Sequence, residues 1–208
     1  MTTSSNSRRS WFGADPGGAG NFGVALLHDD GTTDQGVVSC ADEAIAWLHN
    51  HLDHRSLAGA GIDSPLWWSS AKSSDRNVDR KLRKHYGLAS GPVQTGNSLR
   101  GSVLIQGSIL VTLLRRNFPG LPITEAHPKA LAKALFPVNE FCGVQSCWEI
   151  ELEGISEHAR DATVSALAAR EGFEGRWPCD LGADRHTSEQ EQQNHWLGPI
   201  HYFWPEKI

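Results

Sequence analysis

Four acidic residues and one histidine have a spacing that could support phosphodiester chemistry. Asp15, Asp63 and Glu125 each lie at or near the end of a short segment with the composition of a strand. Asp161 lies in an alanine-rich helical segment, and His158, three residues earlier, shares its helix face. Carboxylates gathered at one sheet edge repel one another unless a cation or a proton neutralises them. Divalent Mg²⁺ or Mn²⁺ would suit such oxygen ligands, and two ions about 3.5–4 Å apart can promote phosphodiester hydrolysis.

Each of these residues also has an ordinary structural explanation. Asp15 and Asp63 both precede turn-forming residues, and aspartate is favoured at turns in any protein. His158 alone could be an exposed helix residue, and Glu125 could simply end a strand. The functional interpretation therefore depends on all of these residues meeting at one edge of a sheet.

The elements that must position them follow from the periodicity of the chain. Strands are expected at 11–15, 22–28, 33–39, 57–63 and 123–127, and helices at 44–52, 75–86, 103–117, 128–135 and 156–171. Tight turns join the first three strands into an antiparallel meander, whereas later strands follow helices and can add in parallel. We therefore expect an α/β fold with a mixed sheet flanked by helices, whose functional groups gather at the carboxyl ends of the strands.

The same pattern predicts one domain. Residues 1–10 are polar and are expected to form a disordered tail, and residues 11–208 to form a single domain with a loop-rich segment from about 173. The closing segment 200–204 could add an edge strand or pack on the core.

Composition narrows the class of protein. The 208 residues carry 24 acidic and 19 basic side chains, a net charge of −5, so nothing indicates strong nonspecific binding to nucleic acid. A hydrophobic share of 39% argues against a wholly disordered chain. Since no segment approaches the roughly 20 apolar residues that span a bilayer, we expect a soluble, cytoplasmic protein without a membrane partner. The cysteines form no Cys-x-x-Cys pair, which favours free thiols over a structural zinc site: Cys40, Cys142, Cys147 and Cys179.

Five segments together resemble a known family. They are Trp11–Asp15 with the return strand Phe22–Ala25, Ile62–Leu66, Glu125–Pro128 and His158–Ala162. In this order they resemble the family called domain of unknown function 429 (DUF429), which is considered RNase H-like and described as predicted nucleases. The resemblance covers roughly residues 11–171 and the closing segment from 198. The His-x-x-Asp-Ala helix is also similar to that of RuvC-type junction resolvases, where such residues serve the metal site.

The resemblance implies a role for each candidate residue. Asp15 would be the central metal-bridging carboxylate and Asp63 the second ligand. Asp161 would complete a two-ion Mg²⁺ or Mn²⁺ site, with His158 as a further ligand or a proton shuttle. Glu125 could be another ligand or could orient a substrate-binding arginine.

Other residues could contact a nucleic-acid substrate. One expected helix carries five cationic residues, among them Arg76 and Arg80, which could hold a phosphate backbone or could form a solvated helix face with neighbouring acids. Arg100 offers another anion contact, and either Arg76 or Arg100 could be oriented by Glu125. Trp67 could stack on a base or could plug the core.

Three functions fit this pattern. The leading hypothesis is a metal-dependent nuclease that hydrolyses DNA or RNA by a two-metal mechanism. A non-catalytic nucleic-acid or protein binding module could retain the same fold and the same acids. An actin-like nucleotide-binding phosphotransferase is suggested by the Asp15–Gly18 turn, but such proteins need two lobes, for which 208 residues are too few unless the chain dimerises to build the cleft. The sequence leaves the oligomeric state open.

Overall fold

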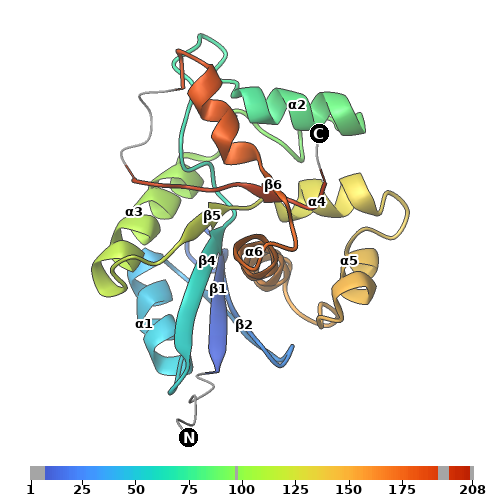
Figure 1. Cartoon of the computed structure of the whole chain (residues 1–208). Helices are drawn as coiled ribbons and strands as arrows, with labels where there is room; N and C mark the ends of the chain where they lie inside the picture. Colours follow the sequence, from blue (N-terminus) through green and yellow to red (C-terminus); the bar gives the residue numbers. More distant parts are fainter. Residues whose placement is uncertain (1–7, 97, 192–196, 207–208) are drawn as a thin grey trace, which may run out of the picture.

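A five-stranded mixed sheet forms the centre of the computed structural model, which describes residues 8–96, 98–191 and 197–206 (Figure 1). Its strand order is β3-β2-β1-β4-β5. The strands are β1 (Arg9–Asp15), β2 (Phe22–His28), β3 (Thr33–Val38), β4 (Ser56–Ile62) and β5 (Ile123–Glu125). β1, β2 and β3 pair antiparallel, whereas β4 pairs parallel with both β1 and β5. The expected α/β fold with a meander followed by parallel strands is thus confirmed.

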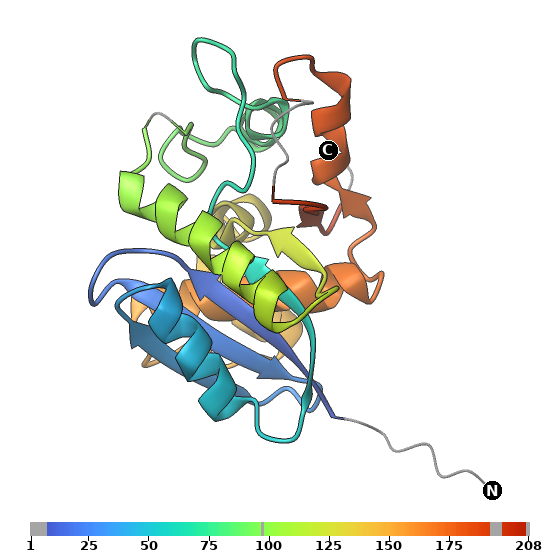
Figure 2. The same ribbon diagram turned by 90° about the vertical axis from the view of Figure 1, so that its left-hand side faces the viewer.

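Helices cover both faces of this sheet. The helices of the described chain are α1 (Ala41–His51), α2 (Asn77–Tyr86), α3 (Gly101–Asn117), α4 (Pro128–Leu135), α5 (Glu140–Trp148), α6 (Glu157–Phe173) and the short 3₁₀ helix η1 (Leu181–Thr187). Figures 1 and 2 show α1 and α3 on one face and α6 on the other, with α4 and α5 beyond α6. Among the helices that the structure describes, none is long and apolar enough to cross a membrane.

Several element boundaries and one whole helix differ from the sequence-based expectation. β1 begins at Arg9, inside the segment expected to be disordered, because Ser10 is fully buried and bonds His28 at 2.8 Å. Residues 1–7 of that expected tail lie outside the described residues. The helix α5 was not expected, since its sequence contains a glycine and few strong helix formers. It is held instead by packing on α4 through the buried Val144.

The closing segment joins the edge of the sheet. His201 forms an isolated parallel bridge with Thr124 of β5, with its backbone bonded to Ile123 and Glu125. Beyond it, β7 (Phe203–Trp204) pairs with β6 (Cys179–Asp180) in a second, two-stranded sheet. The tail therefore extends the sheet by a single bridge and also packs on the core.

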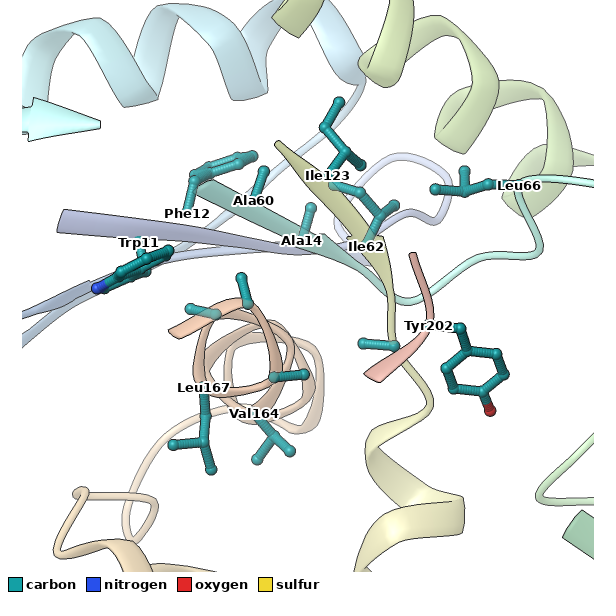
Figure 3. Close-up of a cluster of buried hydrophobic side chains, with 14 of the residues drawn as sticks. Trp11, Phe12, Ala14, Ala60, Ile62, Leu66, Ile123, Val164, Leu167 and Tyr202 are labelled. Atoms are coloured by element: carbon teal, nitrogen blue, oxygen red, sulfur yellow. The ribbon is translucent and has the colours of Figure 1, made fainter. Parts of the chain in front are cut away.

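The helix α6 lies unusually close to the sheet. A Cβ atom built on Gly13 of β1 would come within 1.9 Å of the Ala162 carbonyl oxygen, and one on Gly61 of β4 equally close to that of Ser165. Gly23 of β2 is in the same situation. Figure 3 shows the larger side chains of α6, such as Val164 and Leu167, pointing away from the sheet, whereas Phe12, Ala60 and Ile123 lie on the opposite face. Backbone contact with three strands thus fixes the position of α6.

Candidate functional site

Asp15 and Asp63 reach the face of the sheet covered by α6 through the same local pattern. Each follows a strand glycine by two residues, and these glycines, Gly13 and Gly61, are direct register partners in β1 and β4. Alternate residues of a strand point to the same face of the sheet. Each aspartate therefore lies on the face of the sheet at which the glycine two residues earlier allows close contact with α6. The Asp63 amide continues the ladder by donating to the Ala14 carbonyl at 2.8 Å.

The first turns of α6 bring His158 to these acids. The Ser156 hydroxyl caps the helix by accepting the Ala159 amide at 3.2 Å. His158 Nδ1 then lies 2.7 Å from Asp15 Oδ2, and its Nε2 lies 3.2 Å from the side-chain oxygen of Asn21. His158 and Asp15 are therefore close together, as predicted, and the imidazole is hydrogen-bonded to one oxygen of the carboxylate.

Asp161 is fully buried and only partly satisfied. Its Oδ1 accepts from the Arg160 guanidinium at 3.1 and 3.2 Å. Its Oδ2 lies 3.4 Å from Lys129 Nζ but accepts no hydrogen bond from any described residue. Lys129, in the first turn of α4, also pairs with Glu157 at 2.6 Å. A buried carboxylate oxygen without a hydrogen bond is costly, so this atom marks a position that favours an additional cation or donor.

The three aspartates share excess negative charge. Burial raises the pKa of Asp15 to about 6, against the opposing hydrogen bond from His158. Burial and the neighbouring carboxylates of Asp15 and Asp161 raise the pKa of Asp63 well above its usual range. Burial also raises the pKa of Asp161, although Arg160 and Lys129 oppose it. We call Asp15, Asp63 and Asp161 the acidic site; its ionised form is destabilised and calls for a cation.

The donor set suits a hard divalent ion, but the ligands are not assembled as they stand. In the part of the chain that is described, no group of three His, Cys, Asp or Glu side chains is already close enough to hold a metal ion. Asp15 is bonded to His158, and Asp161 to Arg160. Three carboxylates, one of which has a buried oxygen that accepts no hydrogen bond from a described residue, fit Mg²⁺ or Mn²⁺ chemically. Binding would require these side chains to turn from their present partners.

Glu125 lies apart from the acidic site for a reason of register. It is paired with Ile62, so its side chain shares the face of Ile62 and points away from that of Asp63, one residue later. There it accepts the Leu66 amide at 2.9 Å and two donors of Arg76 at 2.6 and 2.8 Å. Of the two roles predicted for Glu125, the structure favours orientation of Arg76 over ligation of a metal.

Arg76 is therefore not available to a phosphate. Its guanidinium bonds Glu125, two oxygens of Asp79 at 2.8 Å and the Trp67 carbonyl, which together engage all five N–H donors. The side chain is 2% exposed. We call Arg76, Asp79 and Glu125 the closed cluster, since its charges are paired and buried.

The predicted stacking role of Trp67 does not fit its position either. The ring is 1% exposed, lies under the Arg76 guanidinium at 4.3 Å, and donates from Nε1 to Glu191 at 3.1 Å. Trp67 therefore belongs to the packing around the closed cluster. Its neighbour Trp68 is 44% exposed.

Two neighbouring cavities adjoin the acidic site, and Asp15 and Lys129 line both of them. The smaller, about 170 Å³, is also lined by Asp63, and the larger, about 560 Å³, by Arg100 and His158, whereas Asp161 lines neither. Arg100 thus lies where an anion beside the acids could meet it, as predicted. Arg80 is exposed on α2, bonds the Asn77 side chain and lines neither cavity.

Lys129 is the functional candidate that the sequence analysis missed. It lines both cavities and supplies a cation to Asp161. The available signal was its position directly after the proline that opens a helix, just beyond a strand that ends at this edge.

Comparison with known proteins adds no assignment. No family model matches the chain, and no curated protein or solved structure matches it significantly.

Proposed function

We propose that this protein is a metal-dependent nuclease with an RNase H-like fold, related to the DUF429 family. The observation that carries the proposal is the acidic site, three aspartates from β1, the end of β4 and α6 with raised pKa values, in which Asp161 Oδ2 pairs with Lys129 at 3.4 Å but accepts no hydrogen bond from a described residue. The sheet order and the placement of the acids support it. In this proposal the three aspartates hold Mg²⁺ or Mn²⁺, and the protein acts in the cytoplasm.

The residues around the acidic site have distinct tasks in this mechanism. When bound, divalent ions would activate a water molecule and neutralise charge on the phosphodiester. His158 would hold the Asp15 carboxylate through Nδ1 and release it for ligation. Arg100 and Lys129, on the walls of the larger cavity, would contact phosphate oxygens of the substrate strand.

A metal titration with cleavage assays tests the proposal. Thermal unfolding of wild type and of Asp15→Asn would be followed across a Mn²⁺ titration, and both would be incubated with labelled single-stranded and branched DNA and RNA. We expect Mn²⁺ to stabilise only the wild type, and Asp15→Asn to lose on the order of 10³-fold or more in cleavage, since a ligated ion supplies several kcal/mol of transition-state stabilisation. Asp42→Asn, an exposed acid of α1, is the matched control.

The result that would contradict the proposal is equally clear. Cleavage that survives Asp15→Asn would remove the acidic site from the mechanism. The absence of any metal response and of any cleavage in the wild type would favour the binding module, whose acids have only protein partners such as His158, Lys129 and Arg160.

A further inference from the structure

A third cavity adjoins the acidic site on the side of α3. It encloses about 380 Å³, within the range of small-molecule sites. One wall is the segment 65–69 that follows Asp63, and another is formed by Leu104 and Ser108 of α3. Trp68 contributes an aromatic surface that is 44% exposed. The cavity is therefore largely apolar and reachable from solvent.

Its polar groups suit the edge of a flat ring. Ser69 and Ser108 line it with hydroxyl groups; the Ser69 hydroxyl accepts the Ala71 amide at 3.2 Å and can still donate, and that of Ser108 can donate or accept. Among the described residues that line it, Arg76 is the only charged one, and its donors are engaged by the closed cluster. The described walls therefore offer an anion no available cation, whereas they offer a neutral heteroaromatic ring apolar surface, an indole and hydroxyl groups.

The cavity borders the smaller cavity beside the acidic site. Pro65 lines both this cavity and the smaller cavity that contains Asp15 and Asp63. On α3, Val103 lines the acidic side and the next residue, Leu104, lines the apolar side. A phosphate at the acids and a ring attached to it could therefore occupy the two cavities together.

We propose that this cavity is a nucleobase subsite, which takes one unpaired base of the strand whose phosphodiester lies at the acidic site. The inference rests on the proposed nuclease function and names its substrate class, single-stranded or locally unpaired nucleic acid. A base held in a duplex cannot enter an enclosed site without leaving the stack. The serine hydroxyls can meet either donors or acceptors, so the subsite accepts different bases.

Cleavage of matched oligonucleotides tests the subsite. The substrates are a single strand, its duplex, and the same single strand with abasic residues, each with Mn²⁺. We expect the intact single strand to be cleaved about tenfold or more faster than the other two, because base stacking on an aromatic side chain has that order of effect. Ser108→Phe, which fills the cavity, should remove this preference. Ile105→Phe, on an exposed position of the same helix, should keep it.

A second measurement separates this proposal from the nuclease function. Saturation-transfer NMR with deoxyadenosine, which carries no phosphate, reports base binding without any cleavage. We expect saturation transfer to the base protons with wild type and Ile105→Phe, and loss of transfer with Ser108→Phe and Trp68→Leu. The Trp68→Leu variant keeps the subsite testable if Ser108→Phe does not fold. Deoxyadenosine binding without cleavage would support the subsite and refute the nuclease. Equal cleavage of intact and abasic strands, or equal transfer with all variants, would overturn the subsite.

Discussion

The acidic site and the closed cluster lie at the same edge of one sheet and use the same residue types in opposite ways. In the closed cluster two carboxylates surround one guanidinium whose five donors are all engaged, and the group is sealed from solvent. In the acidic site three carboxylates share fewer donors, and one buried oxygen of Asp161, 3.4 Å from Lys129, accepts no hydrogen bond from the described residues. The first arrangement stabilises the fold, whereas the second stores repulsion that a bound cation would relieve. Local charge balance, more than the presence of acids, separates the structural cluster from the functional candidate.

Breaking the closed cluster should have the largest effect on stability. Arg76→Met leaves two buried carboxylates without their cation, so we expect a loss of about 3–5 kcal/mol in the free energy of unfolding. Chemical denaturation measures it. Arg80→Met, at an exposed position of the same helix, is the control and should change the value by less than about 0.5 kcal/mol. A small effect of Arg76→Met would mean that the cluster contributes little to the fold.

A substitution that pushes the backbone of α6 away from the sheet should reduce both stability and Mn²⁺ binding at the acidic site. Gly61→Ala places a methyl group against the Ser165 carbonyl, so we expect a loss of about 1–3 kcal/mol in stability together with weaker Mn²⁺ binding. Gly101→Ala, where an added Cβ meets nothing within 4 Å, is the matched control. Calorimetric titration with Mn²⁺ would measure the second effect, and unaltered binding would show that the site tolerates movement of α6.

The pH dependence of stability should distinguish the acidic site from a cluster such as the closed cluster, in which the charges are paired. Since the pKa of Asp15 is raised from 3.8 to about 6, the folded state binds this proton more tightly than the unfolded state. Without metal, the destabilisation is present above pH 6 and is relieved as the pH falls through 6 toward 4, by about 1–3 kcal/mol. The free energy of unfolding in urea, measured against pH for wild type and for Asp15→Asn, isolates this contribution as the difference between the two proteins. Parallel curves for the two proteins would contradict it.

The smallest effect concerns the cation already present. Lys129→Gln should tighten Mn²⁺ binding by a few-fold, because a half-exposed ammonium ion near Asp161 repels the metal and contributes about 1 kcal/mol or less. Lys133→Gln, on the same helix with the same 46% exposure, should leave the affinity unchanged. Weaker binding in Lys129→Gln would indicate that Lys129 organises the carboxylates for the metal.

Much of the fold could be predicted from the sequence. Hydrophobic periodicity and turn residues indicate the meander, the later strands and α6, because burial on one or both faces imposes those patterns. The pairing of Asp15 with His158 also follows from the pattern, since strand ends and a helix start meet at one edge. The position of α4 residues over α6 depends on tertiary packing, and for this reason Lys129 was overlooked.

The side to which Glu125 points could not be predicted from the sequence. The expected strand at 123–127 ends two residues later than β5, and nothing in the sequence shows which residue pairs with Ile62. A shift of one residue in register moves a side chain to the other face of the sheet. That single uncertainty decides whether Glu125 joins the acidic site or binds Arg76.

The glycines beneath α6 also determine how such a site could be retuned. At Gly13, Gly23 and Gly61 the helix and the strands meet through backbone atoms with no side chain between them, so main-chain contacts set the separation of Asp161 from Asp15 and Asp63. Substitution of Gly13, Gly23 or Gly61 by alanine would increase the distance between the sheet and one part of α6, at a position chosen by the designer. The ion radius that the site accepts would then become an adjustable property of the scaffold, independent of the ligands themselves.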